Sequence, residues 1–330
     1  MPTILVTGAS GFIAKHITRE LLADGYRVRA SVRSERRRAE IEELFPEADL
    51  EFVSLDLTRD AGWAEALQGV DALCHTASPF PANQPKDPQD VIRPAVDGTM
   101  RALRAAQAAG VRRVVLTSSC AAVYKDSTKP REAISTRDNW TDPDDKGTTA
   151  YEASKTLAER AAWDFASAHP EMELTTINPG IVMGPPMDLH FGTSLGYVEE
   201  FLAGRYPAVP PVTLPIVDVR DVARMHVAAL SKPVSVGKRY PANAKALTMV
   251  DIAKLLKRHY PGRRISSIAI PVWLVRLLTP VVPLFAQIVD GLTRNLDIDA
   301  SDAERELEFR YIPADDSILA SAEYLVAHGK

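Results

Sequence analysis

The chain has 330 residues, of which 46% are hydrophobic and 25% are charged, and its formal net charge at pH 7 is −4. This composition is that of an ordinary globular protein, and the length suits one large domain that carries a smaller lobe. The weak negative charge gives no reason to expect nucleic acid or an anionic membrane as a partner.

Short apolar runs alternate with helical patterns through the first 180 residues. Strand-like runs lie at 3–7, 27–32, 50–55, 72–77, 114–118 and 174–178, and helical patterns lie between most of them, for example at 13–24, 94–109 and 151–168. Near-continuous apolar strands between helices indicate a parallel sheet that is covered on both faces. Right-handed crossovers then predict a doubly wound α/β sheet of the Rossmann type.

The pattern changes after Pro179. Residues 183–212 are rich in Pro and Gly, and Pro207, Pro210 and Pro211 argue against a regular helix there. A strand at 216–219 and a helix at 222–230 indicate a return to the sheet domain, and the chain from about residue 248 is expected to be mostly helical. We therefore predict a Rossmann domain over 1–182 with a return segment at 213–243, and a mixed, mostly helical lobe from 183–212 and 244–330.

The first residues of the chain, its cysteines and a late apolar stretch are the features that bear on the cellular location of the protein. No basic leader or cleavable apolar segment precedes the run 4–6, and Cys74 and Cys120 lie in apolar strand-like runs, so we expect a cytoplasmic protein without disulfides. The late apolar stretch 271–292 has an uncharged part at 277–289, shorter than the roughly 20 residues that span a bilayer. We expect a broken amphipathic helix over the ligand site there, with peripheral membrane contact as the less favoured alternative.

A glycine-rich turn joins the first predicted strand to the first predicted helix. It has the form Gly8-x-x-Gly11-x-x-Ala14. Glycine allows positive φ and a close approach of the backbone to a pyrophosphate, and a helix N-terminus adds free N–H groups and a partial positive charge. The turn predicts a dinucleotide site, with a plain tight turn as the alternative.

Arginines follow the second predicted strand. Arg33 stands where an NAD-specific site normally carries Asp or Glu, and Arg36, Arg37 and Arg38 come next. Guanidinium groups match a ribose 2′-phosphate in charge and geometry, so NADPH is predicted in preference to NADH. Arg36 and Arg38 are expected to pair with neighbouring glutamates on the helix surface. Asp56, after the third strand, suits a hydrogen bond to the adenine edge.

Ser119, Tyr151 and Lys155 form a third group of candidate functional residues. Tyr151 and Lys155 are four residues apart, so they share one face of a helix. An ammonium, together with an oxidised nicotinamide, stabilises a phenolate and would lower the tyrosine pKa from about 10. Ser119 ends the fifth strand, at the sheet edge where ligands bind, and its hydroxyl can hold a carbonyl oxygen. Each residue alone is explained by packing or capping, but together with the glycine turn they predict a carbonyl-reducing site.

The remaining candidates are assigned structural roles, except one. Cys120 has no histidine partner by motif and is predicted to be a buried thiol. His75 is expected to be structural, whereas His190, in the loop 184–192, is a candidate for lining the substrate pocket. No His/Cys/Asp group has metal-ligand spacing, so no metal site is expected.

Together these residues resemble the extended short-chain dehydrogenase/reductase family, and within it the dihydroflavonol-4-reductase-like group of NADPH-dependent aldehyde and ketone reductases. The matching segments span most of the chain: TGASGFIA (7–14), SVRS (31–34), HTASPF (75–80), PAVDGT (94–99), LTSS (116–119), YEASKTLAE (151–159), NPGIVMGP (178–185) and VDVRDVA (217–223).

The resemblance implies roles for individual residues. It makes Ser119, Tyr151 and Lys155 the catalytic triad. It implies these cofactor contacts: Gly8, Ser10, Gly11, Phe12 and Ile13 at the pyrophosphate; Arg33 and Arg37 at the 2′-phosphate; Asp56 and Leu57 at adenine; Thr76, Ala77 and Ser78 at the middle of the cofactor; Thr117, Tyr151 and Lys155 beside it; and Pro179, Gly180 and Val182 at the nicotinamide side.

Two departures from the family bear on the substrate. The loop 125–145 carries Asn139-Trp140 but no pattern that names a flavonoid, and the Asn-Trp-Tyr-Cys run of cinnamoyl-CoA reductases is absent. Both argue against plant polyphenol or CoA-thioester substrates.

We therefore expect an NADPH-dependent oxidoreductase, monomer or homodimer, that reduces a small aldehyde or ketone to an alcohol. An NAD-dependent sugar-nucleotide epimerase or dehydratase, or a 3β-hydroxysteroid-type dehydrogenase, is an alternative within the superfamily, and Arg33 argues against the NAD enzymes. A non-enzymatic NADP(H) sensor is the alternative of another class, and the complete Ser/Tyr/Lys set argues against it. Substrate identity depends on the loops 125–145 and 183–212.

Overall fold

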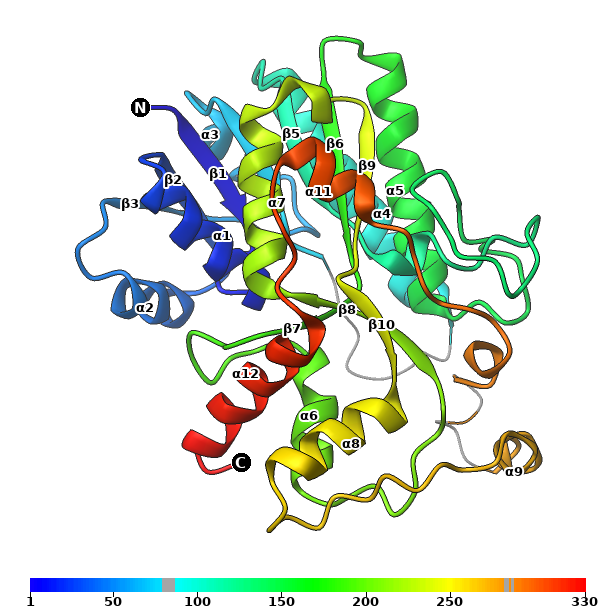
Figure 1. Cartoon of the computed structure of the whole chain (residues 1–330). Helices are drawn as coiled ribbons and strands as arrows, with labels where there is room; N and C mark the ends of the chain where they lie inside the picture. The colour runs from blue at the N-terminus through cyan, green and yellow to red at the C-terminus, as the bar shows by residue number, and fades with distance from the viewer. Residues whose placement is uncertain (79–86, 282–284, 286–287) are drawn as a thin grey trace.

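The computed structural model describes residues 1–78, 87–281, 285 and 288–330, and a seven-stranded parallel sheet forms its centre (Figure 1). The strand order is β3-β2-β1-β4-β5-β6-β9, and the order reverses between β1 and β4, as in a doubly wound sheet. The predicted fold class is confirmed. The strands of this sheet are β1 (Thr3–Thr7), β2 (Arg27–Val32), β3 (Leu50–Ser54), β4 (Ala72–His75), β5 (Arg113–Thr117), β6 (Glu173–Pro179) and β9 (Lys238–Ala242).

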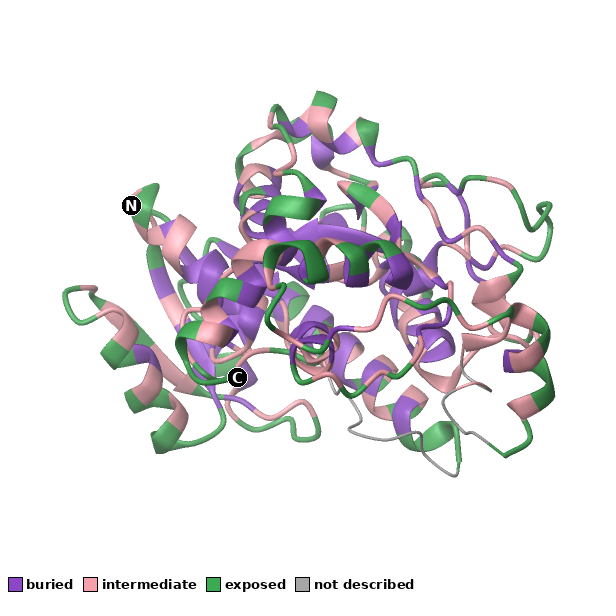
Figure 2. Cartoon of the chain, turned by 60° about the horizontal axis from the view of Figure 1, so that its bottom comes forward, coloured by how far each residue is buried: buried purple, intermediate pink, exposed green. Residues whose placement is uncertain are grey.

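Helices cover both faces of this sheet because alternate strand residues point to opposite sides. Ile4 and Val6 of β1 pack in one cluster with α1 (Phe12–Ala23) and α7 (Val219–Ser231). Leu5 packs in another cluster with α3 (Trp63–Leu67), α4 (Gln89–Ala108) and α5 (Ala150–Ala168). Figure 2 shows the result, a buried sheet between helices whose outer faces are exposed.

A smaller three-stranded sheet forms the second half of the molecule. Its order is β10-β8-β7, from β7 (Ile181–Met183), β8 (Thr213–Asp218) and β10 (Lys245–Thr248), and only the β8–β10 pair is antiparallel. Its core includes side chains of α6 (Ser194–Leu202), α8 (Met249–His259) and α12 (Ala314–Ala327). The other helices are α2 (Glu35–Leu44), α9 (Val272–Leu278) and α11 (Ser301–Leu307).

Three expectations about elements need correction. The segment 183–212 contains α6, because its prolines at 207, 210 and 211 all follow the last residue of that helix. Helix α4 begins at Gln89 and includes Pro94, five residues before the predicted start. The return segment is divided, because β8 joins the small sheet while α7 packs on the large sheet and β9 forms its edge. Strand-like sequence alone does not say which sheet a strand enters.

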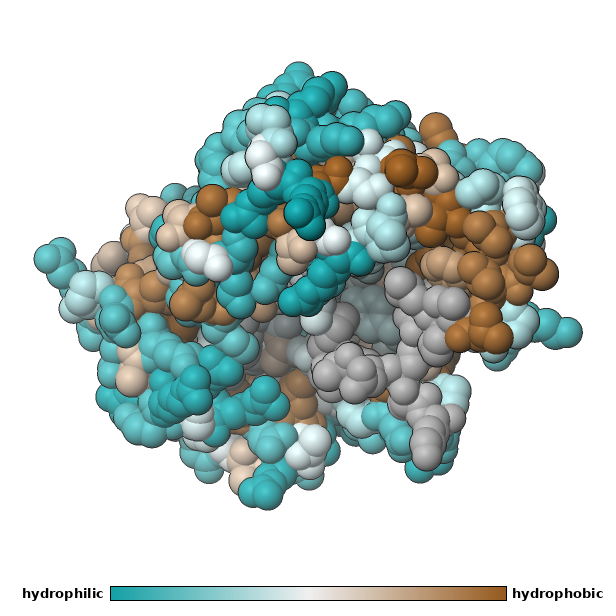
Figure 3. Space-filling view, turned by 90° about the horizontal axis from the view of Figure 1, so that it is seen from below, coloured by the Kyte–Doolittle hydropathy of each residue, from teal (hydrophilic) through white to brown (hydrophobic). Residues whose placement is uncertain are grey.

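The late apolar stretch forms short pieces, α9 and a 3₁₀ turn at Asp290–Leu292, and residues 282–284 and 286–287 lie outside the described part of the chain. Exposed apolar side chains gather around α9, among them Trp273 and Leu277, on the right of Figure 3. No helix within the described ranges is both long and apolar enough to cross a membrane.

Candidate active site

The glycine-rich turn is shaped to accept a dinucleotide. Gly8 has a φ of +64°, and a side-chain carbon there would lie 3.1 Å from Ala77, so both the backbone and the space require glycine. Gly11 is the N-cap of α1, whose first turn contains no acidic residue, so its N–H groups and partial positive charge are available to an anion. The other predicted pyrophosphate contacts lie on the same turn: Ser10, Phe12 and Ile13.

Thr7 fixes the next loop against this turn. The Thr7 Oγ1 accepts hydrogen bonds from the N–H groups of Thr76 and Ala77, each at 3.1 Å, and lies 2.9 Å from Nδ1 of His75. Residues 76–78 therefore lie beside Gly8, where the cofactor contacts were predicted; residues 79 and 80 of the same motif lie outside the described residues. The sequence analysis quoted Thr7 in a motif but did not identify this role.

The arginines after β2 differ in their side-chain contacts. Arg33 is exposed at the end of the strand. Arg37 donates to Glu40 at 2.6 Å, and its Nη2 lies 3.5 Å from Nδ1 of His190. Arg36 and Arg38 form ion pairs with Glu40 and Glu42 on the surface of α2, as the sequence analysis expected.

The adenine-side residues follow β3. The carboxylate of Asp56 accepts from the N–H and hydroxyl of Thr58 at 2.8 and 2.7 Å, and these hydrogen bonds, the backbone one foremost, lower its pKa. An ionised carboxylate is an acceptor that suits an adenine amino group. Leu57 packs over Gly98 of α4, where a side-chain carbon would lie 3.2 Å from Leu57 Cβ.

Ser119 and Tyr151 are positioned by two helix starts. Ser119 follows β5, and its Oγ accepts from the N–H of Ala121 at 3.1 Å, which caps the 3₁₀ turn Cys120–Ala122. Thr149 begins α5 through a capping box with Glu152, which places Tyr151 in the first turn. A hydrogen bond joins the side chains of Ser119 and Tyr151.

Lys155 lies one turn further along α5. Its Nζ is 5.9 Å from the centre of the Tyr151 ring and donates to the Ser78 hydroxyl at 3.0 Å. The structure therefore brings Ser119, Tyr151 and Lys155 together with the loop that follows β4, at the carboxyl edge of the sheet.

The pKa values in this cluster follow from burial. Burial raises the pKa of Tyr151 above its usual value, and the hydrogen bond with Ser119 opposes that rise. The lowered tyrosine pKa suggested by the sequence is therefore not found in this structure. Burial also lowers the pKa of Lys155 from 10.5 to about 8, against an opposing effect of the Glu159 carboxylate.

A cavity of about 600 Å³ opens beside Ser119 and Tyr151. Pro179 and Gly180 form part of its wall at the end of β6, where a side-chain carbon on Gly180 would lie 2.4 Å from the carbonyl oxygen of Pro215. Its other lining residues include Tyr124, Lys125, Glu152, Ile181, Tyr197, Tyr206, Val212, Leu214, Ile288, Gly291 and Leu296. A larger groove of about 960 Å³ runs along α3 and α4, but none of the catalytic candidates line it.

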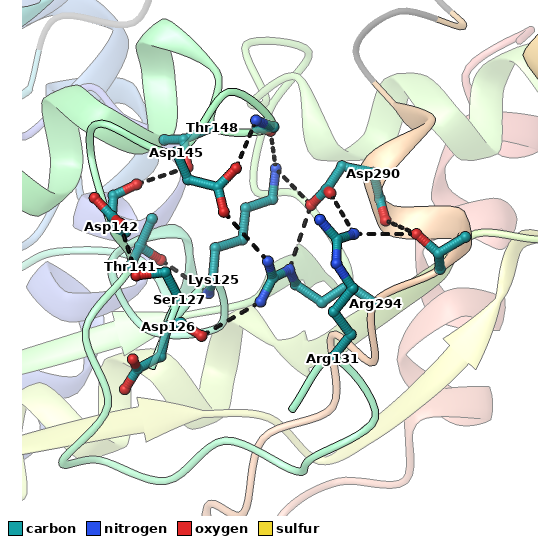
Figure 4. Close-up of polar contacts among 12 residues, drawn as sticks. Lys125, Asp126, Ser127, Arg131, Thr141, Asp142, Asp145, Thr148, Asp290 and Arg294 are labelled. Carbon is teal, nitrogen blue, oxygen red and sulfur yellow. Dashed lines mark hydrogen bonds and ion pairs between the residues drawn. The ribbon is translucent and has the colours of Figure 1, made fainter. Parts of the chain in front are cut away.

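A cluster of charged residues holds one wall of the 600 Å³ cavity. Figure 4 shows Lys125, Arg131 and Arg294 directed at Asp290. Asp290 accepts from Arg131 at 2.7 Å and from Arg294 at 3.3 Å, and lies 3.7 Å from the Lys125 ammonium. Lys125 also donates to Glu152 at 2.8 Å. These contacts attach the segment 288–296 to the loop 125–148. No local motif indicates them, because 165 positions separate Lys125 from Asp290 in the sequence.

Three candidates lie away from the expected contacts. His190 is exposed beside Arg37 and is not among the residues that line the cavity. Thr117 directs its hydroxyl to Nε2 of His226 at 2.7 Å, on the α7 side of the sheet, and Val182 is buried in β7.

Burial raises the pKa of the Cys120 thiol, which fits the predicted inert role. Among residues 1–78, 87–281, 285 and 288–330, no group of three or more His, Cys, Asp or Glu side chains could hold a metal ion.

The chain is similar in sequence and structure to known proteins. Residues 4–243 match the model of the NAD dependent epimerase/dehydratase family. Cinnamoyl-CoA reductase 1 of Petunia hybrida is 35% identical over 263 residues, which cover 78% of this chain and 77% of that protein. A putative uncharacterized oxidoreductase of Schizosaccharomyces pombe is 36% identical over 280 residues, which cover 79% and 83% of the two chains.

Solved structures are similar over nearly the whole chain. The yeast methylglyoxal/isovaleraldehyde reductase Gre2 complexed with NADPH has a TM-score of 0.83 and 26% identity, with 99% of this chain and 98% of that chain covered. Gre2 of Candida albicans in complex with NADPH also has a TM-score of 0.83, with 27% identity and full coverage of both chains. The chain therefore belongs to the NAD dependent epimerase/dehydratase family, the extended short-chain dehydrogenases/reductases, and lies among their reductase members.

Proposed function

We propose that this chain is an NADPH-dependent reductase that converts an uncharged aldehyde or ketone with an apolar body to the alcohol. The observation that carries the proposal is the convergence of Ser119, Tyr151 and Lys155 on the wall of a cavity beside a glycine cradle for a dinucleotide. NADPH, when bound, supplies the hydride for the carbonyl carbon.

The protein's own residues handle the carbonyl oxygen. The Ser119 hydroxyl holds that oxygen beside Tyr151, because the two side chains are already hydrogen-bonded to each other. The Tyr151 phenol donates its proton to the oxygen as negative charge develops there. Lys155, protonated below a pKa of about 8, would stabilise the resulting phenolate, and its ammonium, which donates to the Ser78 hydroxyl, would also bind the cofactor ribose.

NADPH is preferred in this proposal over NADH. Arg33 is exposed at the edge where the adenosine ribose would lie, and Arg37 is close by on α2. The exposed Arg33 guanidinium can bind a 2′-phosphate, whereas Arg37 is paired with Glu40 and would reach the phosphate with its other nitrogen, and positions 33–34 carry no acidic residue that would repel it.

The chemistry of the cavity supports an uncharged substrate. Four tyrosine rings and several aliphatic side chains line it, and the one lysine among its lining residues is paired with Glu152 and Asp290. A diphosphate or CoA group would need free cations, and Lys125 is not free. The Petunia hybrida relative is named as a cinnamoyl-CoA reductase, and we do not propose a CoA thioester as the substrate of this chain.

The test is oxidation of NADPH and NADH, followed by nicotinamide absorbance, with a panel of aldehydes, diketones and aromatic ketones. We expect turnover with NADPH well above NADH. Tyr151→Phe should lower turnover by about 10²- to 10⁴-fold, because the proton donor is lost, while NADPH fluorescence titration shows unchanged binding. Tyr206→Phe, which changes another tyrosine of the same cavity, is the matched control and should keep turnover within a few-fold.

Other outcomes point to the alternatives. Near-wild-type turnover of Tyr151→Phe would contradict the assigned proton donor. NADPH binding without turnover of any carbonyl would favour a sensor, and tightly bound NAD in the purified protein would favour an epimerase or dehydratase.

A further inference from the structure

Glu159 is a buried carboxylate directly behind the catalytic residues. It lies on α5, one turn beyond Lys155, and its side chain is 0% exposed. Five side chains donate to its two oxygens: Ser118 at 2.6 Å, Asn178 at 2.6 Å, Arg239 at 2.7 Å, Thr176 at 2.9 Å and Trp163 at 3.3 Å. A buried carboxylate with this many donors stays ionised, and its pKa is below the usual value although burial itself would raise it.

The contacts of Glu159 lead directly to Ser119. Ser118 precedes Ser119 in the chain, and the Asn178 amide that donates to Glu159 also donates to the Ser119 carbonyl oxygen at 3.2 Å. The carboxylate therefore fixes the backbone on both sides of the Ser119 Cα, and with it the direction of the Ser119 hydroxyl.

Arg239 extends this arrangement to the loop beside the cavity. Its Nη1 donates to the carbonyl oxygens of Arg137 and Asn139 at 2.8 and 2.6 Å, and its guanidinium carbon lies 3.6 Å from the centre of the Trp140 ring. Its Nη2 also donates to the carbonyl oxygen of Ala122 at 3.3 Å. Glu159 and Arg239 thus join β6, β9, α5 and the loop 137–140 at a single buried ion pair.

The charge of Glu159 also acts on Lys155. The titratable groups that face the Lys155 ammonium are His75 of β4 and Tyr151 and Glu159 of α5. Burial lowers the pKa of His75 to about 4, so that imidazole is neutral near pH 7, and the Tyr151 phenol is protonated. Glu159 is therefore the anionic one of these three groups.

We propose that Glu159 is a positioning residue for the reaction: it fixes the Ser119 turn against α5 and supplies the negative charge that keeps Lys155 protonated. This inference rests on the proposed function for its kinetic consequences, but its structural and electrostatic parts hold for the protein without substrate or cofactor.

The first test is Glu159→Gln, which keeps the size of the side chain and removes its charge. We expect turnover with NADPH to fall about 10- to 100-fold, because misplacement of a catalytic group by a fraction of an ångström has effects of this order. We also expect the pH at which wild-type turnover declines, near the Lys155 pKa, to move down by about one unit. Glu159→Asp keeps the charge and should restore the wild-type pH profile even if turnover stays intermediate.

A second readout needs neither substrate nor cofactor. The Lys155 ammonium is titrated by lysine-selective NMR in the cofactor-free protein, with its signal assigned by its loss in Lys155→Met. Its pKa should be lower in Glu159→Gln than in the wild type. Asp221→Asn is the matched control, because Asp221 is also a fully buried carboxylate, and it is bound by Arg224 and the Ile312 N–H rather than by a catalytic residue. The Lys155 titration in this variant should equal that of the wild type.

A double variant distinguishes a failure to fold from the loss of the proposed role of Glu159. Glu159→Gln leaves Arg239 buried without its counter-ion, so Glu159→Gln with Arg239→Met removes both charges and should fold if the single variant does not. Its Lys155 titration should still move down. An unchanged Lys155 titration together with an unchanged pH profile in a folded variant that carries Glu159→Gln, single or double, would overturn the inference. A wild-type protein that turns over no carbonyl would overturn the proposed function instead, and the NMR titration would still decide the electrostatic part.

Discussion

The part of the site that is predicted to bind the cofactor and the cavity beside Ser119 and Tyr151 are assembled in different ways. We call the first the cofactor half and the second the substrate half. In the cofactor half, most of the predicted contacts follow the carboxyl ends of neighbouring strands of one sheet, so their positions follow from their places in the chain. In the substrate half, the cavity wall comes from segments as distant as Lys125 and Leu296 and is held by ion pairs between them. A local motif therefore locates the reaction centre, whereas the substrate wall depends on contacts that no local motif records.

The largest expected effect concerns acid stability, which should be lost first in the cofactor half. His16, His75 and His226 are buried there, and burial lowers the pKa of each to about 4. Between pH 6.5 and 4 the unfolded chain binds protons that the folded chain does not, so stability falls as the pH falls through this range. Each histidine then costs about 2 kcal/mol at pH 5, as an order of magnitude.

Melting curves between pH 7 and pH 5 test whether stability falls as the pH falls. Hydrogen exchange shows which half of the site opens first. Amides of β1, β4 and α7 should lose protection before those of α8 and α12. His16→Gln should reduce the dependence on pH, and earlier opening of α8 and α12 would contradict the comparison.

A smaller effect is expected at the edge of the cofactor half. Arg33→Ser should weaken NADPH binding by about 10- to 100-fold, because a charged hydrogen-bonding partner of the 2′-phosphate is removed. NADH binding should be unchanged. Arg36→Ser, in the first turn of α2 and paired with Glu40, is the control and should leave both affinities as they are. Fluorescence titration measures the affinities, and equal losses for both nucleotides would refute the assignment.

The smallest effect is expected in the substrate half. Asp290→Asn should raise the KM for a bulky aromatic ketone by about 3- to 10-fold, because loss of the charge loosens a wall held by a partly buried ion-pair cluster. The KM for a small aldehyde and the NADPH affinity should not change. Asp142→Asn removes another acid of the loop 125–148, one that binds Ser127 and the Asp144 N–H rather than Asp290 or its cations, and should have no effect. A uniform rise in KM across substrate sizes would show that Asp290 does not act through the wall.

The sequence predicted most of the cofactor half and little of the substrate half. Gly8, Arg33, Ser119 and Tyr151 were identifiable because strand ends and helix starts carry local signals. Glu159 belonged to a recognised segment, yet its role depends on Arg239, which is 80 residues away and carries no signal of its own. The helix α6 was missed because the prolines that follow it were taken to exclude helix from the whole segment.

Gly180 lies at one of the points where the chain passes from the large sheet to the small sheet. The chain leaves the large sheet at Pro179 and enters the small sheet at Ile181, and Gly180 between them sits against the Pro215 carbonyl with no room for a side chain. This short and tightly packed crossing fixes the end of β6 against β8, beside the cavity. We therefore expect substitutions in the remote wall segments to alter which compounds enter the cavity. The positions of the catalytic side chains relative to one another should not change.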